Sequence, residues 1–192
     1  TEAAGIVVGV GAGVTHIAAG DRVICGGRCG MMKSFVTVAA VACAPLPSGL
    51  DFAEGASFNV AYSTAYHCLV ERARLEPRDA VLINGATGGV GFAAVQLARA
   101  LGCTTVVATG TSAARLEGLR AAGASDVVDL AATPVGGLAD AVKALTGGRG
   151  VDVVFDPVGG EIFEQSLRAT AWGARVAIVG FAGGDNSRSS RG

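Results

Sequence analysis

INGATGGVGF, residues Ile83 to Phe92, holds four glycines within seven positions. Such a cluster indicates a backbone with positive φ, or one that another group approaches closely, because glycine in a regular element costs conformational entropy. The apolar run before it, Ala80 to Ile83, is typical of a buried parallel strand, and the segment after it, Phe92 to Gly102, consists of good helix formers closed by a glycine. Strand, glycine turn and helix predict a site for a diphosphate, since a helix N-terminus offers N–H donors and partial positive charge to an anion.

From Asp79 onward, strand-like and helix-like segments alternate at the spacing of βαβ units. We expect strands over 81–84, 105–109, 126–129, 151–155 and 175–179. We expect helices directly after the glycine turn and over 113–122, 137–146 and 162–171. This alternation predicts the α/β class, with a doubly wound parallel Rossmann sheet.

The first part of the chain has a different texture. From Gly5 to Leu46, short β-rich runs are separated by glycine turns, as in part of a small barrel. Helical patterns follow over 51–58 and 61–75, joined through Asn59 and Val60. The chain has no initiator methionine and opens inside a strand-like run, so we expect it to be truncated. It ends in DNSRSSRG, which is typical of a disordered polar tail.

Composition excludes several classes of partner. Lysine and arginine number 15 against 16 acidic residues, so we expect no nucleic acid or anionic membrane surface as a partner. The apolar share is 51% without a run of membrane-spanning length, which predicts a soluble protein with no membrane span. The five cysteines are scattered without a C-x-x-C pair, which argues against a disulfide framework and a closed zinc site, and we expect buried free thiols.

Two readings of the glycine loop share its spacing. The pattern A-x-G-x-x-G from Ala86 is a Rossmann fingerprint with alanine at its first position, whereas G-x-x-x-G-x-G from Gly85 is the spacing of short-chain dehydrogenases. The latter enzymes need a tyrosine and a lysine four residues apart, well after the loop, as proton donor. The two tyrosines of the chain, Tyr62 and Tyr66, both precede the loop. The required chemistry therefore excludes the short-chain reading.

The end of the second predicted strand bears on which nicotinamide cofactor fits. In NAD-specific sheets an acidic residue about 20 positions beyond the loop binds the ribose. Gly110 stands at that place, so no carboxylate repels a 2′-phosphate, and the nearby Thr111, Ser112 and Arg115 offer the donors that a phosphate monoester needs. Thr111 and Ser112 can also be the cap of the next helix, and both roles can hold together. We therefore expect NADP(H) rather than NAD(H).

Five motifs in order resemble the zinc-free quinone oxidoreductases, the zeta-crystallin-like branch of the medium-chain dehydrogenase/reductase superfamily. They are GDRV (20–23), TAYHCL (64–69), VLINGATGGVGFAAVQLARALG (81–102), GVDVVFDPVGG (150–160) and GARVAIVGFAGG (173–184). The resemblance implies a partial GroES-like catalytic domain over 1–56 and a Rossmann NADP-binding domain over 57–184, ahead of a disordered tail over 185–192. It also implies a chain truncated at both ends, with little activity of its own.

The resemblance assigns cofactor-binding residues in three groups. They are the pyrophosphate loop Thr87, Gly88, Gly89 and Val90; the 2′-phosphate region Gly110, Thr111, Ser112 and Arg115; and the nicotinamide-side strand ends Asp156, Val158, Ile178, Val179, Gly180 and Phe181. Asp156 can equally cap the helix that follows it. No metal is expected, because zinc-dependent relatives carry a histidine where Thr1 precedes Glu2 here. No catalytic residue is assigned, since the cofactor carries the hydride chemistry.

Three functions fit these features. The first is an NADPH-dependent reductase of a quinone or an electrophilic alkene, and the second is an enoyl-thioester reductase of the same superfamily. The third is a non-enzymatic nucleotide-binding module. The resemblance implies a small-molecule substrate and full-length relatives that are homo-oligomers, and we expect a cytoplasmic protein, with a mitochondrial location as the alternative.

Overall fold

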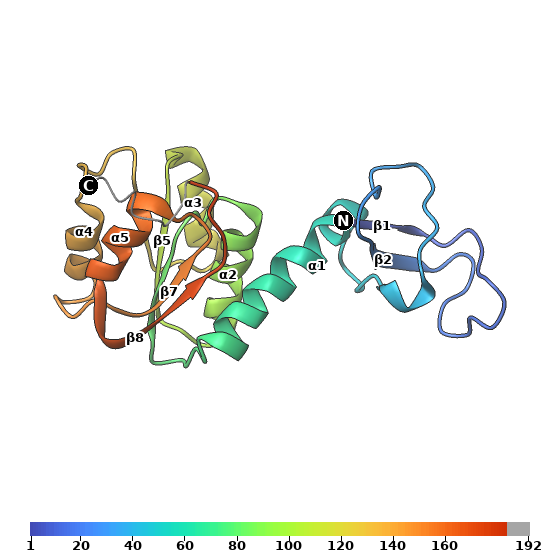
Figure 1. The fold of residues 1–192 in the computed structure, drawn as a ribbon, viewed down its shortest axis with the longest axis horizontal. Helices are drawn as coiled ribbons and strands as arrows, with labels where there is room; N and C mark the ends of the chain where they lie inside the picture. The colour runs from blue at the N-terminus through green and yellow to red at the C-terminus, as the bar shows by residue number, and fades with distance from the viewer. Residues whose placement is uncertain (184–192) are drawn as a thin grey trace, which may run out of the picture. The chain divides into compact units, whose positions relative to one another are not determined.

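The computed structural model describes residues 1–183, which divide into two compact units, Thr1–Ala61 and a second that begins at Tyr62 (Figure 1). The predicted boundary after Ala56 lies inside a helix, and those domain limits stay a prediction. Gly184 and the predicted tail over 185–192 lie outside the described residues. Among the residues described, no helix has the length and apolar character needed to cross a bilayer.

The second unit is built on a five-stranded sheet with the order β6-β5-β4-β7-β8. Each pair of neighbouring strands is parallel, and the first strand along the chain lies in the middle, which confirms the doubly wound Rossmann fold. The strands are β4 (Ala80–Ile83), β5 (Thr105–Gly110), β6 (Asp126–Asp129), β7 (Val151–Asp156) and β8 (Thr170–Ile178).

Helices cover both faces of this sheet. Figure 1 shows α4 (Leu138–Leu145) and α5 (Gly160–Arg168) on one face, and α2 (Gly89–Ala100) and α3 (Ala113–Ala122) on the other. Leu82 of β4 belongs to an apolar core that includes Val142 of α4. Because helices lie on both sides, all four residues of β4 are buried, as its uninterrupted apolar sequence predicted.

Two predicted helix ends were wrong. Helix α2 begins at Gly89 rather than at Phe92, so the last glycines of the loop form its first turn. The helix expected over 162–171 ends at Arg168, and β8 begins at Thr170. Val151 pairs with Thr170 and donates its N–H to the Ala169 carbonyl at 2.9 Å, so sheet pairing decides the conformation there rather than helix propensity.

The first unit contains a three-stranded antiparallel sheet with the order β1-β2-β3. Its strands are β1 (Glu2–Ile6), β2 (Arg22–Gly26) and β3 (Cys43–Pro45), with the 3-10 helix η1 (Ala40–Ala42) directly before β3. The β-rich runs over 8–14 and 35–38 are not strands, because neither pairs with a strand in the described part of the chain. The GroES-like character of this region stays a prediction.

The two helical runs expected between the sheets form one element followed by a wider turn. Helix α1 (Phe52–Tyr66) runs through Asn59 and Val60 without a break. The π-helix η2 (His67–Arg72) continues from it. The residues directly after η2 are bonded to β8, because the Arg175 guanidinium donates to the carbonyls of Ala73 and Arg74, both at 2.8 Å.

Candidate functional site

The three predicted cofactor-binding groups lie at one edge of the parallel sheet. The glycine loop follows β4, Gly110 ends β5 and Asp156 ends β7. Because parallel strands have their carboxyl ends on the same side, these segments meet there. The chain winds outward in opposite directions from β4 and β7, and in open α/β sheets ligands bind at such a switch point.

The end of the glycine loop packs tightly against its beginning. A Cβ at Gly91 would lie 2.5 Å from the Gly85 carbonyl oxygen, so only glycine lets α2 begin this close to β4. Gly85 has a φ of +56°, in the left-handed region that favours glycine, and a Cβ there would lie 2.8 Å from Val158 Cγ2. These contacts bring the glycine loop against the turn that follows β7.

The middle of the loop is open where its two ends are closed. Gly88 and Gly89 are exposed, and a Cβ at Gly89 would meet no atom within 4 Å. Gly88 is the N-cap of α2 and has no side chain to satisfy the first turn, and the N–H groups of Gly89 and Val90 have no helical carbonyl one turn before them. This arrangement gives an anion room beside unbonded N–H donors at the positive end of a helix.

The proposed 2′-phosphate region adjoins this loop. Ala86 donates its N–H to the Thr109 carbonyl at 2.8 Å, and a Cβ at Gly110 would lie 2.7 Å from Thr87 Cγ2. Packing against Thr87 is therefore a reason for glycine at position 110 that has nothing to do with a phosphate. The lack of a carboxylate at position 110 is therefore weaker evidence for NADP(H) over NAD(H) than it was from the sequence alone.

Three polar side chains follow Gly110 at the start of α3. Thr111 is exposed and Ser112 half-buried, and Ser112 occupies the N-cap position without making a side-chain capping hydrogen bond. Capping therefore does not account for the Ser112 hydroxyl. Arg115 is exposed, and within the described residues its guanidinium makes no hydrogen bond or ion pair. The three groups are available to a ligand with phosphate oxygens.

Sequence reasoning missed Asp129, which lies beside this region. It ends β6 and pairs in register with Gly110, while Leu130 donates its N–H to the Gly110 carbonyl at 2.8 Å. One carboxylate oxygen of Asp129 accepts a hydrogen bond from the Ala131 N–H at 2.9 Å. Its position at the carboxyl end of the third strand was the available signal.

A buried polar network connects the ends of the central strands. Asn84, directly after β4, donates through Nδ2 to Asp156 Oδ1 at 3.0 Å and to Ser166 Oγ at 2.8 Å. Thr109 of β5 donates to Asn84 Oδ1 at 3.3 Å. All four side chains are fully buried, so the network fixes where the loops leave the sheet. Asn84 was not singled out from the sequence, although a polar residue closing a wholly buried strand is the signal.

Asp156 supports the turn before α5. Its Oδ1 accepts from the Val158 N–H at 3.2 Å, and its Oδ2 accepts from the N–H of Gly159, the N-cap of α5, at 3.1 Å. Of the two roles considered from the sequence, the structure contains this capping role. Contact of Asp156 with a ribose stays a prediction, and its side chain is fully buried in the network.

The remaining predicted residues are Val158, in the turn after β7, and Ile178 to Phe181, at and after the end of β8. Val179 donates its N–H to the Asp156 carbonyl at 2.8 Å, and a Cβ at Gly180 would lie 3.4 Å from the Pro157 carbonyl. Val158 is half-buried, whereas Ile178 and Phe181 are exposed. The segment therefore offers an apolar surface next to the glycine loop.

No metal centre is evident in the described part of the chain. No group of three or more histidine, cysteine, aspartate or glutamate side chains within residues 1–183 is arranged to hold a metal ion. All five cysteines are free thiols, of which only Cys103 is buried. The expectation of buried thiols is therefore wrong for the other four, because they lie in segments with incomplete cover.

Comparisons with known proteins agree on the kind of protein this chain resembles. A family described as zinc-binding dehydrogenase matches residues 89–191. Quinone oxidoreductase-like protein 2 homolog from Nematostella vectensis is 37% identical over 190 residues, which cover 96% of this chain and 50% of the relative. The chain spans about half the length of the curated quinone oxidoreductase-like relatives it matches.

Solved structures resemble the chain across both units. The Escherichia coli quinone oxidoreductase, in a complex with NADPH, has a TM-score of 0.86 and 33% identity, and the match covers 98% of this chain and 57% of that one. The CurK enoyl reductase has a TM-score of 0.79 and 32% identity, over 91% of this chain and 51% of that one.

Proposed function

We propose that this chain, which belongs to the zinc-binding dehydrogenase family and within it to the quinone oxidoreductase branch, binds NADP(H) and serves an oxidoreductase that reduces a quinone or an electrophilic alkene. One observation carries the proposal. The open first turn of α2, and Arg115 without an ion pair among the described residues, lie at the same edge of the sheet, after the neighbouring strands β4 and β5 beside the switch point.

The glycine loop suits the pyrophosphate. The N–H groups of Gly89 and Val90 point out of the first turn of α2, as helix geometry requires, and no side chain occupies the space next to Gly89. Thr87, half-buried over the end of β5, adds a hydroxyl at the rim. The buried network under the loop holds these groups in place before any ligand arrives.

Arg115, Ser112 and Thr111 suit the 2′-phosphate. A guanidinium without an internal partner gains a charge-assisted pair when a dianionic phosphate binds. Asp129 on the neighbouring strand acts in the opposite direction, because its carboxylate repels a phosphate and favours a ribose hydroxyl. We propose that the attraction between the Arg115 guanidinium and the 2′-phosphate is stronger than the repulsion from the Asp129 carboxylate.

The apolar segment after β8 suits the nicotinamide side. Bound NADPH supplies the hydride, which is the chemistry of the cofactor. Val158, Ile178 and Phe181 would shield a bound nicotinamide ring from water. The N–H groups of Val179, Ala182 and Gly183 donate to the carbonyls of Asp156, Pro157 and Val158, which fixes this segment to the turn after β7. No proton donor is assigned.

Zinc has no part in the proposal. The family description names zinc, but the described residues do not fit the ion, because they bring no three suitable side chains together. The chain is therefore proposed to act as the zinc-independent branch that its motifs resemble.

A second candidate is reduction of an enoyl thioester. It is favoured by the similarity to the CurK enoyl reductase at a TM-score of 0.79. The nucleotide site is the same in both candidates, so they differ only in the acceptor. A homo-oligomer and a cytoplasmic location are also proposals, and the exposed Trp172 and Ile178 on the edge strand β8 are consistent with contact between copies.

Calorimetric titration with NADPH and NADH tests the cofactor. We expect the wild-type chain to bind NADPH more tightly, and Arg115→Ala to lower NADPH affinity by about ten- to a hundredfold while leaving NADH nearly unchanged, since a charge-assisted bond contributes about 1.5–3 kcal/mol. Arg120→Ala is the matched control, because Arg120 lies on the same helix and donates to the Ser125 carbonyl at 3.2 Å. Preference for NADH, or equal losses with both cofactors, contradicts the proposal.

Turnover with two acceptors separates the functions. NADPH oxidation is followed with a simple quinone and with an enoyl thioester in one preparation of a full-length protein that carries this sequence, because this chain alone is expected to have little activity. Faster quinone reduction supports the first candidate, and faster thioester reduction supports the second. Tight NADPH binding with turnover of neither indicates a nucleotide-binding module.

A further inference from the structure

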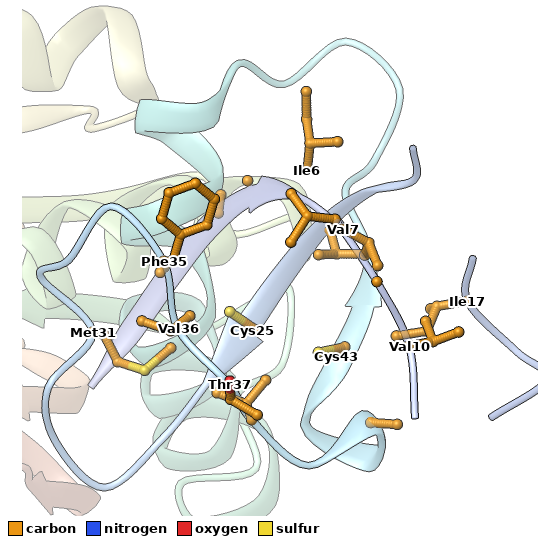
Figure 2. Close-up of a pocket in the computed structure, with 18 of the residues that line it drawn as sticks. Ile6, Val7, Val10, Ile17, Cys25, Met31, Phe35, Val36, Thr37 and Cys43 are labelled. Carbon is orange, nitrogen blue, oxygen red and sulfur yellow. The ribbon is translucent and has the colours of Figure 1, made fainter. Parts of the chain in front are cut away.

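Two cysteines of the first unit lie directly opposite each other. Cys25 of β2 and Cys43 of β3 are paired in register across the antiparallel ladder. Residues paired in this way project from the same face of a sheet. Both side chains line a cavity of about 540 Å³, whose wall also includes Met31, Phe35 and Val36 (Figure 2).

The hydrogen-bond pattern shows which type of pair the cysteines form. Leu46 donates its N–H to the Arg22 carbonyl at 2.8 Å, and these residues occupy the next position of the same register, so theirs is a hydrogen-bonded pair. Hydrogen-bonded and non-hydrogen-bonded pairs alternate along an antiparallel ladder. The next pair, Val23 with Pro45, is non-hydrogen-bonded, in agreement with the missing N–H of proline. The pair of Cys25 and Cys43 lies two positions beyond it and is therefore of the same type. The cysteines therefore form a non-hydrogen-bonded pair.

That pair type has the spacing a disulfide needs. Cα atoms in non-hydrogen-bonded antiparallel pairs are about 4.5 Å apart, with the side chains closer than in the alternate pairs. Disulfides span Cα separations of about 4.4–6.8 Å. The two backbones are therefore in range, and only side-chain rotation is required to bring the sulfur atoms together.

We propose that Cys25 and Cys43 form a reversible disulfide across β2 and β3, on the wall of the cavity, by exchange with a low-molecular-weight disulfide. Neither cysteine is in a disulfide and both are half-buried on the cavity wall, where a small reagent can reach them, and the Cys43 thiol makes one long contact, 4.0 Å, to the Ala39 carbonyl. Strand β3 has only three residues, so this bond would fix a short strand to its neighbour. The proposal is independent of the nucleotide site.

The exchange balances in two steps. One cysteine thiolate attacks a sulfur of the reagent, whose S–S bond breaks and releases one small thiol. The second cysteine thiolate attacks the protein sulfur of the mixed disulfide and releases the other small thiol. The two protein thiols lose two protons and two electrons in total, and the reagent is reduced to two thiols.

The other cysteines lack this geometry. Cys103 is buried and donates its thiol to the Glu76 carbonyl at 3.4 Å. Cys68 lies in η2 and Cys29 in the exposed loop after β2. Burial and the neighbouring Cys43 raise the pKa of the Cys25 thiol, so only a small fraction of it is thiolate at neutral pH and the exchange becomes faster as the pH rises.

Peptide mapping of the full chain tests the proposal directly. The protein is incubated with oxidised glutathione, remaining thiols are alkylated, and the chain is cut with trypsin and a glutamate-specific protease. Cys25, Cys29, Cys43 and Cys68 then fall in four separate peptides, 23–28, 29–33, 34–54 and 55–71. We expect a linked pair of 23–28 with 34–54, and a fall of two in the count of titratable thiols from the starting five.

Single replacements provide the controls. Cys25→Ser and Cys43→Ser should each abolish the linked species, whereas Cys29→Ser should leave its yield and its reversal by dithiothreitol unchanged. The wild-type map does not depend on how any variant folds. Linkage of Cys25 to Cys29, or oxidation that ends in glutathione adducts without a linked pair, overturns the proposal.

Discussion

The two sheets of this chain differ in how completely they are covered. In β4 of the parallel sheet every residue is buried, whereas in β1 of the antiparallel sheet none is, and Ile6 is 58% exposed. The first four parallel strands along the chain, β4 to β7, are each followed by a helix, so the second unit carries its own cover. Apolar burial, and hence most of the folding free energy, is concentrated in the second unit.

The same contrast separates two kinds of chemistry. The proposed nucleotide site stands on the covered sheet, where a buried network fixes the ends of the strands. The proposed thiol pair stands on the open sheet, where a reagent has access. The two proposed sites thus differ in how much of the sheet beneath them is covered.

The largest effect is expected at the glycine loop. Gly91→Ala places a Cβ 2.5 Å from the Gly85 carbonyl, so we expect a loss of about 3 kcal/mol in unfolding free energy and of NADPH binding. Gly89→Ala is the matched control, because its Cβ meets no atom within 4 Å. It should keep the stability but weaken NADPH binding. Denaturant unfolding and calorimetric titration of both variants check this, and equal stabilities would contradict the packing argument.

The buried network comes next. Asn84→Ala removes the donor to Asp156 and Ser166, and we expect a loss of about 2 kcal/mol in unfolding free energy because buried polar partners are left unsatisfied. Asp21→Ala in the first unit is the comparison, since among residues 1–183 its carboxylate accepts a single hydrogen bond, from the exposed Ala18 N–H. We expect that change to stay within about 0.5 kcal/mol. Comparable losses at both positions would remove the difference between the two sheets.

A smaller, pH-dependent effect is expected at Asp152. A hydrogen bond from Arg149 holds the pKa of this carboxyl below its ordinary value of 3.8, and the Ala80 N–H, which also donates to it, acts in the same direction. A depressed folded-state pKa adds stability that is present above the unfolded-state pKa and is lost as the pH falls through the folded-state value. Both groups are partly exposed, so we expect Asp152→Asn to cost less than about 1 kcal/mol near neutral pH.

The measurement is urea unfolding of wild type and Asp152→Asn as the pH is lowered. The stability difference between them should shrink once the pH falls below 3.8. A difference that is constant with pH would show that the Asp152 charge contributes nothing.

The parallel sheet could be predicted because its signals are local. Each buried run, glycine turn and helix lies within a short βαβ unit, so the strands over 126–129 and 105–109 were placed to within a residue. The end of α5 could not be predicted in this way, because it depends on the pairing of Val151 with Thr170 in the sheet. The partnership of Asn84 with Ser166 joins residues 82 positions apart, and no local pattern reports it.

In the first unit the sequence signal was less reliable. Val8 and Val10 have strand propensity, but strands need neighbours to pair with, and these residues have none in the described chain. At the candidate site, the residue types around Gly110 indicated a phosphate, but only the structure showed Thr87 packed against that glycine and Asp129 beside it.

Amide hydrogen exchange with and without NADPH tests most directly whether the carboxyl edge of β4 and β5 binds the cofactor. We predict that NADPH slows exchange most over 85–91 and 110–115, where the glycine loop and the start of α3 present their N–H groups. Unchanged exchange in both segments at saturating NADPH, or protection confined to the strands of the first unit, would contradict the account.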